Sequence, residues 1–222
     1  MPKKARSDDQ VQKIRRRILD EAVGLITTKG FTRLSMRAIA APLGMTAANI
    51  YNYYQNKDEL YLDIQTRGFK QLYELLQQAI QKSSRPEQQI KAVIRAYLEF
   101  GFSSPSLYEI MFTLNTPKYS DYKHTSLEPI ARIEKETALQ SARLVIDAIT
   151  DLPENFSRIS SPDVYFRVIQ TWTALHGIVS LYNSRVLQEI DLDTRAVIDR
   201  CVEEYSRYFS DNLQLKPGVS HE

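Results

Sequence analysis

Residues 35–60 carry the pattern that most restricts the fold: two short amphipathic segments on either side of one glycine, followed by the start of a long helix. Ser35 can cap the first segment, whose apolar side chains recur at helical spacing. Gly44 suits the tight turn that follows, because a residue without a Cβ accepts a positive φ. The second segment runs from Thr46 to about Tyr53. Two short helices joined by such a turn form a helix-turn-helix.

Longer helices are expected on both sides of this motif. Apolar residues at helical spacing predict a helix from Ile14 that stops at Gly30, since glycine suits a helix C-terminus. Downstream, Asn56 and Glu59 form a capping pair for a long helix that extends to about residue 81. The motif is therefore the middle of a helical domain.

The rest of the chain keeps helical periodicity between proline-containing breaks. Further helices are expected after the break at residues 83–86 and over residues 105–114, 127–149, 163–187 and 194–213, with polar loops over 115–126 and 151–162. The sequence predicts an all-α protein of about nine helices, in which a homeodomain-like, three-helix helix-turn-helix domain precedes a larger helical domain. The expected divisions are a basic flexible arm at 1–12, the first domain at 13–60, the second at 61–213 and a flexible tail at 214–222.

Composition excludes several classes of protein. The single cysteine, Cys201, excludes an internal disulfide and a cysteine-cluster metal site, and we expect it to pack as a small apolar residue. The N-terminus lacks an apolar run, and no stretch of eighteen apolar residues occurs, so we expect a cytoplasmic protein with no membrane partner.

Charge is distributed unevenly along the chain. The first sixty residues hold eleven Lys or Arg against six Asp or Glu, whereas the remainder holds eighteen against twenty-one. A basic first domain on a mildly acidic body suits contact with a polyanion.

The second short helix offers groups that suit duplex DNA. Ile39, Leu43 and Ile50 would form its buried seam, which leaves small and polar side chains facing outward. The outward residues are Thr46, Ala47, Ala48, Asn49 and Asn52. Small side chains let the backbone approach base edges, and an asparagine can pair with adenine. The candidates for phosphate contacts are Ser35, Arg37, Thr46, Tyr51, Tyr53 and Lys57, the last at a helix N-terminus with a positive dipole.

Residues 14–62 resemble the DNA-binding domain of TetR-type regulators. The matching features are an isoleucine-alanine pair, a glycine turn, a recognition helix ending in tyrosine, an aromatic pair and a lysine. Here they are Ile39-Ala40, Gly44, Ile50-Tyr51, Tyr53-Tyr54 and Lys57. The resemblance implies that Tyr51, Tyr53 and Lys57 contact phosphates and that Thr46, Ala47 and Ala48 lie nearest the bases. Ala48 departs from the usual glycine, and Pro42 should remove a backbone hydrogen bond from a short helix.

The resemblance extends to the body through one helix. Trp172, His176 and Gly177 resemble the tryptophan, histidine and glycine of one C-terminal subclass of the family. Family membership implies that the last two long helices pair with those of a second subunit in a four-helix bundle. The same faces could instead close an intrachain core, although the helices carry more apolar surface than one partner helix needs. That surface comprises Val164, Ile169, Leu175, Val179 and Leu187.

Aromatic residues of the body are candidates for a ligand pocket, since the resemblance implies an effector that weakens DNA binding. They are Tyr97, Phe100, Tyr108, Met111, Phe112, Trp172 and His176, each of which could instead be ordinary core. The three histidines show no metal-ligand spacing, and no nucleophile motif or phosphate-binding loop occurs, so we expect no enzyme, no metal and no cofactor.

The patterns predict a DNA-binding protein, and the resemblance implies a sequence-specific, homodimeric repressor that a small-molecule effector releases from a palindromic operator. Two alternatives stay open on the sequence. One is an all-helical adaptor that binds proteins and not DNA, and the other packs DNA without regard to sequence.

Overall fold

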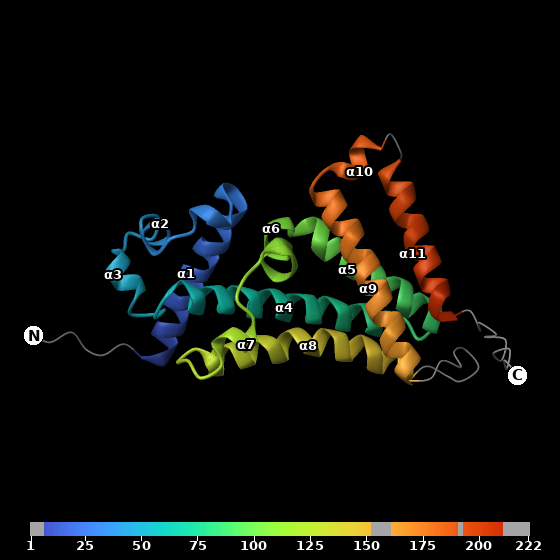
Figure 1. Ribbon diagram of the computed structural model, residues 1–222, viewed down its shortest axis with the longest axis horizontal. Coiled ribbons are helices and arrows are strands. Elements are labelled where there is room, and N and C mark those ends of the chain that lie inside the picture. The colour runs from blue at the N-terminus through green and yellow to red at the C-terminus, as the bar shows by residue number, and fades with distance from the viewer. Residues whose placement is uncertain (1–6, 152–160, 191–192, 211–222) are drawn as a thin grey trace, which may run out of the picture. The chain divides into compact units, whose positions relative to one another are not determined.

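The computed structural model describes residues 7–151, 161–190 and 193–210 (Figure 1). Every regular element in these ranges is a helix, so the all-α prediction is confirmed. The chain divides into two units, Met1–Gln71 with Ser104–Leu139, and Leu72–Ser103 with Gln140–Glu222. Two long helices, α4 (Lys57–Gln81) and α8 (Glu128–Thr150), continue from one unit into the other.

Helix α1 (Asp8–Lys29) begins earlier than predicted. The Ser7 hydroxyl accepts a hydrogen bond from the Gln10 backbone N–H at 3.4 Å, and the Gln10 side chain accepts one from the Ser7 N–H at 3.2 Å. This capping box starts the helix by satisfying two backbone donors at its first turn. The expectation that residues 8–12 belong to a flexible arm is therefore wrong, and residues 1–6 of that arm lie outside the described residues.

The helix-turn-helix consists of α2 (Met36–Ala40) and α3 (Ala47–Ile50). Gly44 lies between them with φ 65°, as the turn requires. Ile39 and Ile50 are fully buried, whereas Leu43, expected in the same seam, is only partly buried. A short 3-10 turn, Phe31–Arg33, connects α1 to this motif.

Both short helices end sooner than the sequence indicates. Helix α2 stops at Ala40, so Pro42 lies in the turn and removes no hydrogen bond from within the helix. The expected cost of this proline is therefore absent. Helix α3 stops at Ile50 because the chain turns there toward α4, and the predicted extension to Tyr53 is wrong.

In the same unit, α4 packs on a segment that leaves regular α-helical geometry. Helix α6 (Pro105–Tyr108) runs into a π-helical turn, η2 (Glu109–Thr113). The Ile110 carbonyl in this turn accepts hydrogen bonds from the Tyr61 hydroxyl at 2.8 Å and the Gln65 side-chain amide at 3.1 Å. Gly68 lies directly against Met111, where a Cβ would collide with the methionine sulfur. The π turn is thus tied to α4 by polar and apolar contacts.

Residues 115–126 were expected to form a loop, but they contain a short helix, α7 (Tyr119–Tyr122). Asp121 initiates it, since its carboxylate accepts a hydrogen bond from the Lys118 N–H at 2.7 Å. Tyr122 then packs with Leu62 of α4 and Ala131 of α8 in a small apolar cluster.

The second unit is built on α5 (Pro86–Ser103), α9 (Ser161–Asn183) and α11 (Thr194–Ser210), which pack against one another. Ion pairs join α5 to α11, with Lys91–Glu203 at 2.8 Å and Arg95–Asp199 at 3.1 Å. The predicted helix over 163–187 is interrupted, since Arg185 takes a left-handed φ of 63° before α10 (Val186–Glu189). Residues 211–213 of the last predicted helix lie outside the described residues.

Short elements account for the difference between the expected count and the structure. The described residues hold eleven α-helices, and the two that the sequence did not indicate, α7 and α10, are four residues each.

Some apolar residues of α9 are buried within the chain and others are exposed. Val164, Leu175 and Val179, counted above as surplus apolar surface, are buried within the chain, so for these three the intrachain alternative holds. The exposed apolar side chains of α9 are Tyr165, Phe166, Trp172 and Leu181.

Candidate nucleic-acid interface

The helix-turn-helix exposes most of the residues predicted to contact DNA. Ser35, Arg37, Thr46, Ala48, Asn49, Tyr51 and Asn52 are exposed, Ala47 and Lys57 are partly buried, and Tyr53 is buried. Ala48 and Asn49 lie on α3, with Thr46 at its start and Tyr51 at its end. Of the predicted base-reading residues, Ala47, Ala48 and Asn49 therefore lie on α3, whereas Thr46 caps it and Asn52 lies in the turn beyond its end.

The hydroxyls of Ser35 and Thr46 cap helices and still have a proton that each can donate. Ser35 Oγ accepts a hydrogen bond from the Ala38 N–H, and Thr46 Oγ1 accepts one from the Asn49 N–H, both at 3.2 Å. Each hydroxyl caps a helix as an acceptor and keeps its own proton, which can be donated to a phosphate oxygen. Capping and phosphate contact are thus compatible at both positions.

The two tyrosines assigned to phosphates differ in exposure. Tyr51 is 54% exposed, whereas Tyr53 is 7% exposed. Tyr53 therefore contributes packing beneath the turn, which the sequence did not indicate. A contact between its hydroxyl and a phosphate stays a prediction.

The N-terminus of α4 combines a cap with an inward-facing carboxylate. Asn56 Oδ1 accepts a hydrogen bond from the Glu59 N–H at 2.9 Å, which confirms the cap predicted from this pair. The Glu59 carboxylate accepts one from the Gln55 N–H at 2.7 Å, and the residue is only 5% exposed. Its charge is therefore directed into the protein, while Lys57 occupies the first position of the helix.

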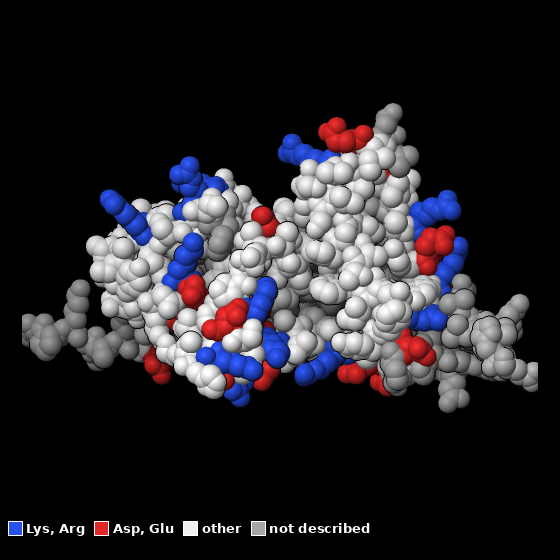
Figure 2. Space-filling model, viewed as in Figure 1, with Lys and Arg blue, Asp and Glu red and all other residues white. Residues whose placement is uncertain are grey.

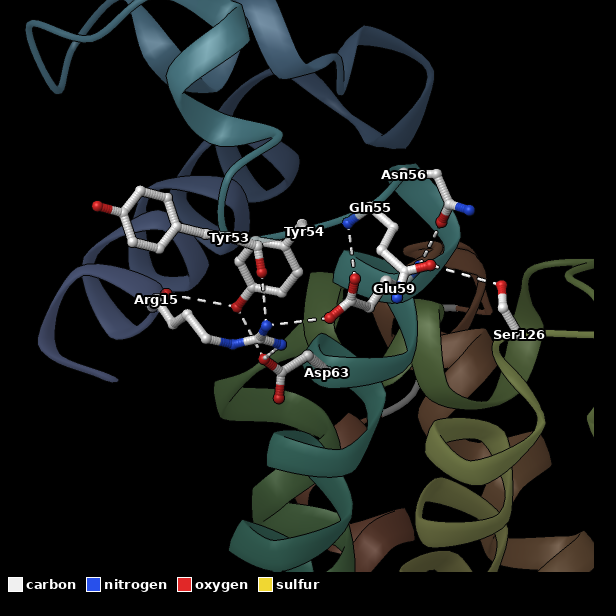
Figure 3. Close-up of polar contacts among 8 residues, drawn as sticks. All are labelled: Arg15, Tyr53, Tyr54, Gln55, Asn56, Glu59, Asp63 and Ser126. Carbon is white, nitrogen blue, oxygen red and sulfur yellow. Dashed lines mark hydrogen bonds and ion pairs between the residues drawn. The ribbon is translucent and has the colours of Figure 1, made fainter. Parts of the chain in front are cut away.

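Arg15 of α1 joins the turn after α3 to α4 (Figure 3). Its Nη1 donates to the Tyr53 carbonyl at 2.5 Å and to Glu59 Oε1 at 3.0 Å, and its Nη2 donates to Asp63 Oδ2 at 3.3 Å. The guanidinium lies over the Tyr54 ring, 4.1 Å from its centroid. The Tyr54 hydroxyl donates to the same Asp63 oxygen at 2.7 Å. We call Arg15, Tyr54, Glu59 and Asp63, with the Tyr53 carbonyl, the Arg15 clamp.

Protonation in the Arg15 clamp is fixed by its surroundings. Burial by itself would lower the pKa of Arg15, but the neighbouring Tyr54, Glu59 and Asp63 raise it, so the guanidinium stays charged. Burial and the Asp63 carboxylate raise the pKa of Tyr54 far above its ordinary value. The Tyr54 hydroxyl therefore stays protonated at neutral pH, where it donates to Asp63.

A second contact reaches the same turn from the α7–α8 loop. The Ser126 hydroxyl donates to the Gln55 side-chain oxygen at 3.4 Å (Figure 3). The turn that precedes Lys57 is thus held from two directions, by α1 and by residues far along the chain.

Sequence reasoning missed the Arg15 clamp. The spacing of Glu59 and Asp63, four residues apart, places both carboxylates on one face of α4 and was a usable signal. Arg15 is one of three consecutive arginines, and nothing in the sequence distinguishes the one that turns inward.

Basic side chains stand on the surface around the helix-turn-helix. Lys29, Arg33 and Arg37 are exposed, and Figure 2 shows Lys and Arg side chains over the part of the surface formed by α1 to α3 with few acidic ones among them. This distribution favours a polyanionic partner, as the charge of the first sixty residues predicts.

The candidate ligand residues are distributed over both units. In the first, Tyr108 and Met111 are buried, and the Phe112 ring lies 4.8 Å from that of Tyr108 and 5.5 Å from that of Phe69. In the second, Tyr97 and Phe100 are buried.

Trp172 and His176 lie on α9 in the second unit. Trp172 is 39% exposed, and its ring centroid lies 6.2 Å from that of His176. Burial lowers the pKa of His176.

An open hollow of about 470 Å³ lies at the start of α8 and is lined by none of the candidate ligand residues. Its lining is Thr125, Glu128, Pro129 and Arg132. Among the described residues no group of three or more metal-ligating side chains occurs, and none of the described helices has the length and apolarity needed to cross a membrane.

Comparison with known proteins finds matches for both the helix-turn-helix region and the helical body. Residues 18–64 match the model for bacterial regulatory proteins of the tetR family, and residues 90–205 match the tetracyclin repressor-like C-terminal domain. An uncharacterized HTH-type transcriptional regulator of Haemophilus influenzae is 22% identical over 149 residues, which cover 57% of this chain and 73% of that protein.

Solved structures share the fold. A protein of unknown function from Rhodococcus sp. RHA1 superposes with a TM-score of 0.74 at 19% identity, over 95% of this chain and 100% of that chain. AibR in complex with isovaleryl coenzyme A and operator DNA gives a TM-score of 0.60 at 20% identity, over 86% of this chain and 96% of that chain. The family matches over residues 18–64 and 90–205 favour a DNA-binding regulator over a protein adaptor.

Proposed function

Because this chain belongs to the tetR family of bacterial regulatory proteins, we propose that it is a repressor which a small-molecule effector releases from a palindromic operator. The chain is a DNA-binding transcriptional regulator. The observation that carries the proposal is the exposed α3, with Thr46 and Tyr51 at its ends and Lys57 at the start of the next helix. The functional division that we propose is a DNA-binding domain at 13–60 and an effector-binding and dimerisation domain at 61–213.

In the proposed complex, two subunits insert their α3 helices into successive major grooves about 34 Å apart. Ala47, Ala48 and Asn49 lie nearest the bases, and Asn49 or Asn52 pairs with an adenine edge. Tyr51 and Lys57 contact phosphates and hold the helix in register.

The exposed face of α9 supports a homodimer. Tyr165 and Phe166 are 57% and 59% exposed, and Trp172, seven residues beyond Tyr165, extends the exposed apolar surface along the same side of the helix. Such a surface on a protein of this size is typical of an interface between proteins. We propose that α9 and α11 pair with their copies in a second subunit, as the family resemblance implies.

The contact between η2 and α4 supports release by an effector. The Ile110 carbonyl is bound by Tyr61 and Gln65, and Met111 lies against Gly68. A ligand that displaces η2 therefore acts directly on the helix that begins at Lys57. Such a ligand shifts the population only if it binds the released arrangement more tightly.

The class of effector that we test first is an acyl coenzyme A, because AibR was solved with isovaleryl coenzyme A. We expect isovaleryl or a longer acyl coenzyme A to raise the unfolding temperature and to weaken DNA binding. The assignment of Trp172, His176 and Gly177 to a subclass of the family stays a prediction.

Salt dependence of binding tests the DNA-binding proposal. If each subunit neutralises about four phosphates, the logarithm of the affinity falls with the logarithm of salt concentration at a slope of about −7. The measurement is fluorescence anisotropy of a labelled duplex that the protein selects from a random-sequence library. A slope near zero would show that no counterions are released and that the interface is not the one proposed.

A further inference from the structure

The Arg15 clamp connects two parts of the protein that contact DNA in the proposed complex. The Tyr53 carbonyl lies three residues beyond the end of α3, and Glu59 lies two residues beyond Lys57. One guanidinium nitrogen, Nη1, bonds to both, at 2.5 Å to the carbonyl and 3.0 Å to the carboxylate. The recognition helix and the lysine-bearing end of α4 are thus tied through a single group on α1.

Helix α3 needs such an external tie, because it is a single turn. It extends over four residues, Ala47–Ile50, and only Ile50 among them is fully buried. A hydrogen bond to a base edge is directional, so a small tilt of α3 breaks it. A phosphate contact tolerates the same tilt far better, because attraction between charges depends weakly on angle.

We propose that Arg15 is a positioning residue for sequence recognition, which holds α3 and the Lys57 end of α4 in one arrangement without touching DNA. This inference rests on the DNA-binding function and goes beyond it. The arginine is 24% exposed at its side chain and is directed toward Glu59 and Asp63, so its charge is used within the protein.

The geometry requires arginine and not merely a positive charge. The guanidinium is a planar fork that donates to three acceptors at once, on the Tyr53 backbone, Glu59 and Asp63. A lysine ammonium is a point donor on a flexible stem and cannot reproduce this arrangement. Arg15→Lys therefore preserves the net charge while releasing part of the clamp.

The test compares two duplexes of equal length and composition, one that the wild-type protein selects from a random library and one with the same bases scrambled. We expect Arg15→Lys to weaken binding to the selected duplex about tenfold, as for the loss of a hydrogen bond to a charged group. Binding to the scrambled duplex should change less than about twofold, since phosphate contacts govern it. Arg17→Lys, an exposed neighbour on α1, is the matched control and should change neither.

The ratio of the affinity for the selected duplex to that for the scrambled duplex distinguishes positioning from general destabilisation. Partial unfolding lowers both affinities by the same factor, because only the folded fraction binds. The salt slope distinguishes positioning from a direct contact between Arg15 and a phosphate. Each lost phosphate contact makes the slope shallower by about 0.9. We expect the slope of an Arg15→Gln variant to equal that of the wild type.

Tyr54→Phe supplies a second variant that keeps the fold. It retains the ring beneath Arg15 and removes only the hydroxyl that donates to Asp63, a residue with solvent access. We expect the affinity ratio to fall about threefold, less than in Arg15→Lys. The proposal is overturned if both variants leave the ratio unchanged, or if both duplexes lose affinity equally.

Discussion

Lys57 is the single residue on which the proposed grip on the phosphate backbone depends most. It occupies the first position of a 25-residue helix, where the positive end of the helix dipole reinforces its charge. The neighbouring Glu59 carboxylate is buried and bound to Arg15 and Gln55, so its charge is directed into the protein.

Replacing Lys57 by alanine should therefore remove one phosphate contact per subunit. We expect the salt slope to become shallower by about 0.9 per subunit, with the loss of affinity nearly the same for every sequence. Fluorescence anisotropy over a range of salt concentrations measures both quantities. Lys70→Ala, at an exposed position on the same helix, is the control and should leave the slope unchanged. An unchanged slope in Lys57→Ala would remove this residue from the interface.

Glu134 provides a prediction on stability and pH. Burial raises the pKa of this carboxyl above the ordinary value for a glutamate, although Lys118 acts in the opposite direction. A raised pKa in the folded state means that stability is fully present below the unfolded value and is lost as the pH rises through the folded one.

Glu134→Gln removes the loss of stability that accompanies ionisation of Glu134. We expect the variant to unfold at a higher temperature than the wild type at pH 7, with the difference disappearing near pH 4. Differential scanning calorimetry at the two pH values measures it, and the exposed Glu136→Gln serves as control. A variant less stable than the wild type at pH 7 would show that ionised Glu134 stabilises the fold.

Among the elements, α5 and α9 approach closely at Gly101. A Cβ at this position would lie 2.5 Å and 2.7 Å from the two methyl carbons of Val179, which is itself fully buried. Valine has few rotamers and cannot move aside without shifting α9.

Gly101→Ala should therefore destabilise the protein by about 1–3 kcal/mol, the usual cost of overpacking a core. Gly24→Ala should instead stabilise the protein, because Gly24 lies within α1 with open space around it. Alanine favours a helix over glycine by about 0.5–1 kcal/mol. Urea unfolding of the two variants beside the wild type measures both changes. Equal effects of the two substitutions would contradict the packing described for Gly101.

At this scale the sequence predicted the long helices well and the short ones poorly. Helices α4 and α5 lie where their apolar spacing, the Asn56 cap and Pro86 place them. Helices α7 and α10 are four residues each and are too short to show a period, so their conformation depends on neighbours. The inward orientation of Arg15 could not be predicted either, because its partners lie 38 to 48 residues away along the chain.

For the whole molecule, the exposed apolar face of α9 makes association testable with the chain's own fluorophore. Trp172 is the single tryptophan and is 39% exposed on this face. We expect its emission to shift to longer wavelength as the protein is diluted and the dimer dissociates, because the indole then meets water.

Phe166→Glu should shift that transition to higher protein concentration, since it places a charge on the paired surface without altering the buried residues of α9. Sedimentation velocity over the same concentration range reports the mass directly. A chain that sediments as a monomer at every concentration would contradict pairing through α9.

In the proposed complex, the two helix-turn-helix units of one dimer read duplex DNA at a fixed separation. The most direct measurement is the affinity for the library-selected duplex before and after insertion of about five base pairs, roughly half a helical turn, at its centre. We predict that the insertion lowers the affinity to that of a scrambled duplex, because the half-sites then face opposite sides of the helix. Equal affinity for the selected and the inserted duplex would show that the two units do not read DNA at a fixed separation.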